Sequence, residues 1–427
     1  MALRDKGVFK WRNALRELGR PSVSNFTGSL AEVYSSIKLS YDDLKSEELK
    51  ATFLLCSLMK YSGDVSIMEL FKYGISLGLF EDISPEKAQN KVRLLVHELE
   101  SSCLLLYGHS SDWFTIHDVV RLVAISIASR DQYALTNEAT DWLGKDALGS
   151  CKAIFIHDGN IRELPEGLKC PQLNFFIMLA GSPFMKVPDN FFTGMTNLSV
   201  LNLTKMHFLS LPSSLYLLVN LQTLCLDQCM LGNITGIGDL KNLKSLRLSH
   251  SDIKLLPKDI GQLTQLRILD VSNCCKLKVI SPNVISSLSC LEELSMGNSF
   301  VQWEVEGLNF EGKNASLNGL KHLSKLTSLE IHIKDVRILP RDLFSKNNLR
   351  RYKIFIGDEW EWLAEYETSR TLKLNTSILE CGIIRQLKRI EELCLAELQG
   401  VNNDLYQLDE EGFPQLKHLH IQNNARV

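Results

Sequence analysis

Leucine and other apolar residues recur through the last two thirds of the chain in the pattern LxxLxL, with polar residues at most positions between them. The clearest copies begin 22 to 25 residues apart and read Leu198-Leu201-Leu203, Leu221-Leu224-Leu226, Leu243-Leu246-Leu248, Leu266-Leu269-Val271 and Leu291-Leu294-Met296. Fainter copies lie on both sides, at Cys151-Ile154-Ile156, Leu173-Phe176-Met178, Leu326-Leu329-Ile331, Leu349-Tyr352-Ile354, Ile390-Leu393-Leu395 and Leu416-Leu419-Ile421. The pattern therefore predicts eleven units of one structural repeat.

Each unit is expected to supply one short strand whose apolar side chains point inward. Because a single unit cannot bury that face alone, the units must stack on one another. We therefore expect residues 151–427 to form a curved leucine-rich-repeat solenoid with parallel strands. Two segments interrupt the repeat, 297–325 and 355–389, and the second combines acidic and aromatic residues at 358–362. Insertions of this kind often lie on a binding face, although drift in loop length is the plainer explanation.

Two smaller features accompany the repeat. Asn or Cys is expected three positions after the last apolar strand residue, where its side chain satisfies backbone groups at the bend, and Cys229, Cys274 and Asn424 occupy that position. For the two cysteines this structural role is favoured over a redox role. Leu-Pro or Val-Pro pairs at 164–165, 187–188, 211–212, 256–257 and 339–340 predict an irregular return on the convex side.

Helical periodicity replaces the repeat in the first 130 residues. The spacing predicts helices over 31–44, 47–61, 67–80, 86–101 and 119–129, and a hairpin formed by 103–107 and 113–116. Helices followed by such a hairpin are typical of a winged-helix module. We therefore expect a winged-helix domain at 31–130 and a connector at 131–150, so the fold class is mixed α and β.

Polar residues between the inward leucines are expected to face the concave side of the repeats, where side chains can meet a partner. The candidate partner surface consists of Arg247, Asp270, Glu293, Glu330, His332, Arg351 and Lys353. A mixed-charge row is also typical of a solvated face, and the sequence privileges none of these residues.

Composition excludes several classes of function. A net charge of −3, from 47 Lys+Arg and 50 Asp+Glu, gives no broad positive field for nucleic acid or an anionic membrane. Residues 31–130 hold ten basic and fourteen acidic residues, which argues against a winged-helix transcription factor. Residues 74–78 match G-x-S-x-G, but they fall within the helix predicted over 67–80 rather than on a strand-to-helix turn, and no H-E-x-x-H motif occurs, so the sequence does not indicate a hydrolase. The eleven cysteines show no CxxC pair and no histidine at metal-ligand spacing, so we expect reduced thiols, no metal site and no enzyme activity.

Four stretches, taken in order, resemble plant intracellular disease-resistance proteins with a nucleotide-binding domain and leucine-rich repeats, of the coiled-coil subclass. Residues 37–44 look like the family's KxSYDxL helix, 53–58 like its CFLYCSLFP segment and 116–118 like its Met-His-Asp motif. The Leu-Pro repeats are similar to its cytoplasmic repeat type. The resemblance implies a cytoplasmic protein that recognises a pathogen effector or a guarded host protein and inhibits itself through the winged helix and the repeats.

The chain departs from that family in its nucleotide site. The P-loop GxxxxGK[ST] and the acidic strand that holds magnesium do not occur in this sequence. We therefore expect the chain to begin after them, with 1–30 as a remnant of a small helical domain. In the intact protein we expect the chain to make an intramolecular contact with the nucleotide-binding domain. The full-length family binds ADP or ATP, and no nucleotide is expected on this chain alone.

His117 is the candidate cofactor-binding residue. In the family the matching histidine contacts the diphosphate of ADP in the off state, and an imidazole at a helix start can donate to a phosphate oxygen. The alternative is that His117 and Asp118 only cap a helix beginning at Val119. The resemblance favours an ancestral ADP contact for His117, unused without the P-loop, and leaves Asp118 as a cap.

A stand-alone leucine-rich-repeat adaptor, such as a ligase substrate receptor, would share the repeats. The motifs within 37–118 argue against it. The sequence therefore predicts a non-enzymatic fragment of an immune receptor, with the adaptor as the alternative.

Overall fold

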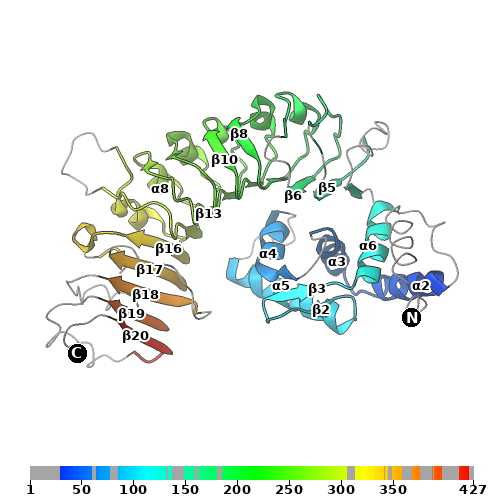
Figure 1. Ribbon diagram of the computed structural model, residues 1–427, viewed down its shortest axis with the longest axis horizontal. Coiled ribbons are helices and arrows are strands. Elements are labelled where there is room, and N and C mark those ends of the chain that lie inside the picture. Colours follow the sequence, from blue (N-terminus) through cyan, green and yellow to red (C-terminus); the bar gives the residue numbers. More distant parts are fainter. Residues whose placement is uncertain are drawn as a thin grey trace. The chain divides into compact units, whose positions relative to one another are not determined.

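The chain forms two compact units (Figure 1). The computed structural model describes residues 29–59, 64–76, 85–130, 133–136, 149–157, 161, 163–179, 185–304, 313–340, 342–344, 349–357, 368–375, 387, 389–396 and 413–422. The first unit comprises 1–162, 167–182 and 193–202, and the second comprises 163–166, 183–192 and 203–427.

Helices make up most of the N-terminal part of the first unit. They are α2 Ser29–Asp42, α3 Glu47–Met59, α4 Ile67–Ser76, α5 Pro85–Ser101 and α6 Asp118–Arg130. Helix α3 is buried on nearly every face from Thr52 to Met59, and the Ser46 hydroxyl caps its first turn by accepting the N–H of Leu49 at 3.1 Å. Helix α5 is amphipathic as the sequence predicts, because its apolar stripe at i, i+3, i+4 and i+7 is buried.

Three short strands, which alternate with these helices along the chain, form a small antiparallel sheet. They are β1 Val65–Ser66, β2 Leu106–Tyr107 and β3 Trp113–Thr115, in the order β1-β3-β2. The predicted hairpin is present, and Gly108 closes it with an N–H bond of 3.0 Å to the Trp113 carbonyl. Only glycine fits there, since a Cβ would lie 2.5 Å from that same oxygen.

Parallel strand pairing begins earlier than the sequence predicts. The segment expected to be a connector contains β4, Tyr133–Thr136, which pairs in parallel with β5, Ala153–His157. Strand β5 pairs in parallel with β6, Phe175–Leu179, and β7, Val200–Leu203, follows in the same sheet. The sequence Tyr-Ala-Leu-Thr has the strand propensity needed to extend the edge of β5, although it lacks the LxxLxL pattern.

The second unit is built on a row of parallel strands, one from each repeat (Figure 1). They are β9 Thr223–Cys225, β11 Ser245–Arg247, β13 Ile268–Asp270, β15 Glu293–Ser295, β16 Ser328–Ile333, β17 Arg351–Gly357, β18 Arg370–Asn375, β19 Glu392–Ala396 and β20 His418–Gln422. Leu224, Leu246, Leu269 and Leu294 are register partners on successive strands, and all four are completely buried. The repeated leucines therefore form one continuous core, which confirms a leucine-rich-repeat fold.

Short elements return the chain between these strands. They are η3 Phe191–Gly194, η4 Ser213–Leu217, η5 Ile237–Asp239, η6 Lys258–Gln262, α8 Val284–Ser287, η7 Leu317–His322 and η8 Val336–Ile338, with the parallel strand pairs β8 His207–Ser210 and β10 Met230–Asn233, and β12 Leu255–Leu256 and β14 Val279–Ile280. Pro212 and Pro257 stand directly before η4 and η6 with φ of −54° and −74°. The predicted Leu-Pro signals therefore mark the entry to these turns, where the fixed φ of proline is already suitable.

One repeat was not predicted from the LxxLxL pattern. Residues 355–389 were expected to interrupt the array, but strand β18 lies within them and pairs in parallel with β17 and β19. Its inward residues are Leu372 and Leu374, both buried, whereas the position that should carry the first leucine holds Ser369. This repeat therefore lacks the first leucine of the LxxLxL pattern. It retains the last two leucines, which are the residues that face the core.

A ladder of side chains supports the bends after the strands. Cys229 and Cys274 each donate from Sγ to a carbonyl of the preceding repeat, at 3.0 Å in both cases. Ser251, at the same position of the repeat between them, donates from Oγ to the Leu226 carbonyl at 2.7 Å. The structural role expected for the two cysteines is thus present, and serine also fills it. Asn424 lies outside the described residues.

Candidate functional sites

Three register rows place all seven candidate surface residues on one face of the β11–β20 sheet, because residues two apart on a strand share a face. The central row contains Arg247, Asp270, Ser295, Glu330, Lys353, Thr371, Glu392 and His418. The first row contains Ile268, Glu293, Ser328 and Arg351. The last row contains His332, Phe355, Lys373, Cys394 and His420.

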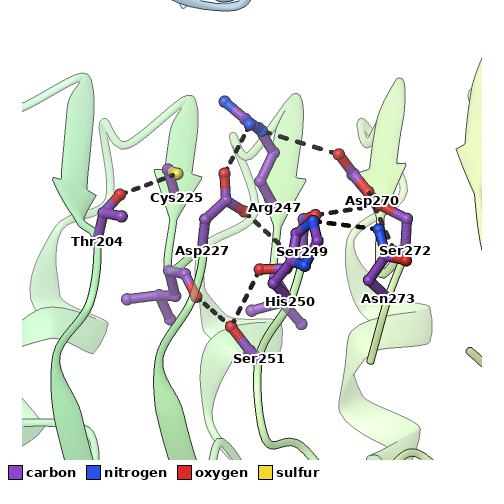
Figure 2. A network of polar contacts seen from close by, with 12 residues as sticks. Thr204, Cys225, Asp227, Arg247, Ser249, His250, Ser251, Asp270, Ser272 and Asn273 are labelled. Carbon is purple, nitrogen blue, oxygen red and sulfur yellow. Dashed lines mark hydrogen bonds and ion pairs between the residues drawn. The ribbon is translucent and has the colours of Figure 1, made fainter. Parts of the chain in front are cut away.

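Arg247 and Asp270 belong to a buried ion cluster rather than to an open surface (Figure 2). A guanidinium nitrogen of Arg247 lies 2.6 Å from Asp227, and its Nε lies 4.0 Å from Asp270. The two carboxylates also accept backbone N–H groups, Asp227 from Ser249 at 2.9 Å and Asp270 from Ser272 at 3.1 Å. These three charged residues therefore hold neighbouring repeats together, and the sequence missed Asp227, which lies just beyond the end of β9.

Burial also determines the chemistry of the cysteine beside this cluster. Cys225 contacts Thr204 through Sγ at 3.9 Å (Figure 2). Burial, with the negative charge of Asp227 as a smaller cause, raises the pKa of the Cys225 thiol to about 12. The thiol is therefore protonated at neutral pH, as expected of a cysteine that only fills space.

Glu293, Arg351, Glu330 and Lys353 form the more accessible part of the candidate surface. Arg351 and Glu293 are joined across two strands by an ion pair of 3.1 Å. Glu330 and Lys353 are direct register partners in the central row, so opposite charges stand side by side there as well. The structure thus brings these four charged residues together over β15, β16 and β17.

His332 is fixed in place by an aromatic group. Its ring stacks on Phe355 with centroids 4.3 Å apart, and its Nε2 lies 2.9 Å from the Gly357 carbonyl. The indole N–H of Trp303 donates to the His332 carbonyl at 3.1 Å. Trp303 comes from the first predicted interruption, 297–325, so part of that insertion packs against the strand ends. The acidic and aromatic residues at 358–362 lie outside the described residues.

His117 occupies the N-cap position of α6. The helix begins at Asp118, one residue earlier than predicted, and the His117 carbonyl accepts the N–H of Arg121 at 2.9 Å. The side chain also contributes, since Nδ1 accepts the N–H of Val119 at 3.2 Å. The cap expected at Asp118 is therefore made by His117, and Asp118 lies in the first turn, where its negative charge suits the helix dipole.

This capping bond determines the tautomer of His117. A ring nitrogen that accepts a hydrogen bond carries no proton, so neutral His117 holds its proton on Nε2. The side chain is exposed. Capping through Nδ1 and donation through Nε2 to an acceptor outside the helix are consequently compatible, and the two interpretations of this residue do not compete.

Glu392, Cys394 and His420 form a polar cluster that the sequence did not reveal. One potential ligand atom from each lies within 4.8 Å of the other two. Glu392 and Cys394 lie on one strand and His420 lies on the strand of the next repeat, so the distance from Cys394 to His420 along the chain is set by the repeat length and not by a familiar metal-binding spacing. The sequence did contain one indication of this cluster: Glu392-x-Cys394 and His418-x-His420 occupy equivalent positions in neighbouring repeats.

Within the described ranges, no helix combines the length and the apolar character needed to cross a bilayer.

Comparison with known proteins adds to this picture. A family model described as a leucine-rich repeat region matches residues 234–426. Disease resistance protein At4g27190 of Arabidopsis thaliana is 28% identical over 433 residues, covering 98% of this chain and 44% of that protein. The probable disease resistance protein At4g27220 is 30% identical over 76% of this chain and 36% of its own length, and disease resistance protein RFL1 is 28% identical over 83% and 37%, both from the same plant.

Among solved structures, a leucine-rich-repeat protein of Leptospira interrogans matches with a TM-score of 0.43 at 19% identity, covering 64% of this chain and 73% of that chain. The chain spans 36 to 44% of the length of these three plant relatives. The match to disease resistance proteins runs through the helical part as well as the repeats, as the covered share of 98% requires. The chain therefore belongs to the family of plant disease resistance proteins with a leucine-rich-repeat region.

Proposed function

We propose that this chain recognises a protein partner through its repeats, a pathogen effector or a guarded host protein, and that its N-terminal module keeps a receptor in an inactive state. The observation that carries the proposal is the mixed-charge face over β15, β16 and β17. Arg351 and Glu293 pair across it at 3.1 Å, and Glu330 and Lys353 stand side by side in the central row. Charges arranged this way provide specificity for a partner with the complementary pattern.

The two kinds of charged residue on this face have different roles in the proposal. Arg247 and Asp270 are buried and hold repeats together, so they position the surface. Glu330 and Lys353 are partly exposed, so they are the residues that meet the partner. Strands place these side chains on a rigid frame, which reduces the conformational entropy lost on binding. The wider array is a curved solenoid in this proposal, with the charged face on its concave side.

Regulation is assigned to residues 31–130 as a winged-helix module. Helices α2 to α6 together with the small antiparallel β1-β3-β2 sheet support this assignment. His117 is its nucleotide contact: with Nδ1 engaged by Val119, the proton on Nε2 is available to a phosphate oxygen of ADP. The P-loop needed to hold the nucleotide is not in this sequence, so the contact operates in a protein that also carries a nucleotide-binding domain.

The proposal also covers the location of the protein, its receptor subclass and its lack of catalytic activity. The chain acts in the cytoplasm, as part of a receptor of the coiled-coil subclass. It is not an enzyme, and it has no nucleic-acid partner, because its net charge of −3 provides no basic field.

A defence assay in plant leaves tests the recognition surface. The chain is expressed behind the nucleotide-binding domain of a relative, and cell death is scored after inoculation with isolates that trigger the wild type. The double variant Glu330→Ala with Lys353→Ala should lose the triggered response at equal protein level. Asp252→Ala with Lys276→Ala removes an exposed ion pair of 2.6 Å elsewhere on the repeats and should leave the response unchanged. Equal responses from both double variants would contradict the assigned surface.

A further inference from the structure

The geometry points to a Zn²⁺-binding site formed by Glu392, Cys394 and His420 on strands β19 and β20. Zn²⁺ is a borderline-soft divalent cation, so it accepts thiolate, imidazole and carboxylate ligands in one site. The site is separate from the recognition surface proposed above, so the two can fail independently.

The backbone brings the three residues together without any loop rearrangement. Cys394 and His420 are direct register partners on neighbouring parallel strands. Glu392 lies two residues before Cys394 on β19, so the two side chains are on the same face of the sheet. Three potential ligands thus come from regular strands, which position side chains more accurately than loops do.

The distances are close to those of a metal centre. The carboxylate Oε1 of Glu392 lies 3.8 Å from Cys394 Sγ and 4.0 Å from His420 Nε2. Tetrahedral Zn²⁺ with bonds of about 2.0 to 2.3 Å places its ligand atoms roughly 3.3 to 3.8 Å apart. All three ligand atoms lie within 4.8 Å of one another, so side-chain shifts of up to about 1 Å bring them to bonding positions.

Two threonines hold the Glu392 carboxylate in the orientation that the site needs. Thr368 Oγ1 donates to Oε2 at 2.7 Å and Thr371 Oγ1 donates to the same oxygen at 3.0 Å. The other oxygen, Oε1, is the one that faces the cysteine and the histidine. Hydrogen bonds to the far side of a ligand are a regular feature of metal sites, because they fix its direction.

The donor set selects among metal ions. Sulfur and nitrogen ligands exclude Ca²⁺ and Mg²⁺, which bind through oxygen atoms. Cys394 binds as the thiolate, so binding releases its proton to solvent and replaces its hydrogen bond to Glu392 with metal–ligand bonds. Water completes a tetrahedral shell.

A metal at this position would strengthen a strand with little buried surface, β20. The β20 residues Leu419 and Ile421 remain 53% and 46% exposed, whereas their register partners Leu393 and Leu395 on β19 are almost completely buried. Apolar burial therefore contributes little to holding β20. A bond from His420 through the ion to Cys394 and Glu392 links the two strands directly.

The test is a Co²⁺ titration of the full chain after treatment with a chelator. The wild type should show a saturating signal at one equivalent, with the d–d bands of tetrahedral Co²⁺ and a thiolate-to-cobalt charge-transfer band. Cys394→Ser should abolish the charge-transfer band, and His420→Gln should abolish saturation at one equivalent. Thr371→Val leaves all three ligands in place and should weaken binding by about ten- to a hundred-fold, as expected for loss of a supporting hydrogen bond.

Matched controls distinguish this site from binding at other thiols and carboxylates. Cys275→Ser removes an exposed thiol, and Glu391→Gln removes the neighbouring carboxylate that pairs with Arg370 at 2.6 Å, so both should keep the signal. The His420 side chain is about one third exposed, so His420→Gln leaves the core intact, and far-UV circular dichroism verifies the fold of each variant. A wild type without a saturable signal, or a charge-transfer band that survives in Cys394→Ser and disappears in Cys275→Ser, would overturn the proposal.

Discussion

The backbone N–H of Val119 donates to Nδ1 of His117 at 3.2 Å, so one side chain both starts helix α6 and carries its proton on the opposite ring nitrogen. This relationship separates two roles that a single substitution to alanine would remove together. Asparagine is among the best N-cap residues and has no imidazole, so His117→Asn keeps the cap and removes the second donor.

The stability of the helix start provides the first prediction. His117→Ala leaves the Val119 N–H without its side-chain acceptor, and loss of an N-cap costs about 1 kcal/mol. Amide hydrogen exchange of Val119 and its neighbours in the first turn of α6 should become roughly fivefold faster. His117→Asn should exchange like the wild type. Identical exchange in all three proteins would show that the ring contributes nothing to the cap.

The second prediction concerns the different reactivity of two adjacent thiols, those of Cys274 and Cys275. Burial raises the pKa of Cys274 to about 12, because the thiolate would lie in an apolar repeat core beside the Leu248 carbonyl. With this pKa, about one Cys274 side chain in 10,000 is a thiolate at pH 8. Cys275 is exposed. Alkylation of the native chain at pH 8, followed by peptide mass spectrometry, should therefore label Cys275 and spare Cys274. Labelling of both at equal rates would show that the repeat opens on the timescale of the reaction.

The core of the repeats could be predicted from sequence because its signal is redundant. Leu224, Leu246 and Leu269 repeat at nearly constant spacing, and each is buried at the same register position. Strand β18 was not predicted, because Ser369 replaces the first leucine of its unit, although that position falls 20 residues after Leu349 and 21 before Ile390. When one leucine of the LxxLxL pattern is missing, a search for the pattern does not find the repeat. The two buried leucines are nevertheless enough to form the strand.

The candidate surface shows a different limit. Sequence alternation placed Arg247 and Lys353 on the same face correctly, and both lie in the central row. It could not show that Arg247 is buried between Asp227 and Asp270 while Lys353 is partly exposed, because the partner Asp227 comes from another repeat. Glu392 and His420 were missed for the same reason. Contacts between repeats depend on register, which a single unit does not encode.

The buried ion cluster leads to the third prediction. Arg247→Ala leaves the carboxylates of Asp227 and Asp270 without their shared cation, and removing one partner from a buried pair costs about 3 to 5 kcal/mol. Their hydrogen bonds to Ser249 and Ser272 remain, so we expect the lower end of that range. Thermal unfolding followed by circular dichroism should show a marked fall in the midpoint. Lys353→Ala, on the same row at a partly exposed position, should change the midpoint little, and an equal fall in both variants would refute the distinction.

The last prediction concerns control of the off state. In a receptor that carries an upstream nucleotide-binding domain, we expect His117→Ala to raise signalling without any pathogen. The reason is that a neutral N–H donor to a charged phosphate is a charge-assisted hydrogen bond, worth roughly 1.5 to 3 kcal/mol. In the proposed mechanism that bond exists only in the ADP-bound state, so its loss should shift the two-state equilibrium toward the active form by about ten-fold or more. Cell-death output in leaves at equal protein level measures the shift.

The asparagine variant decides which role of His117 controls signalling. If the phosphate contact matters, His117→Asn should signal as strongly as His117→Ala, because both lack the Nε2 donor while only the alanine variant lacks the cap. If the cap alone matters, His117→Asn should stay silent like the wild type. Asp118→Asn removes a negative charge from the first turn of α6 and leaves both functions of the ring in place, so it should also stay silent. Silence of all three variants would leave His117 as a purely structural residue.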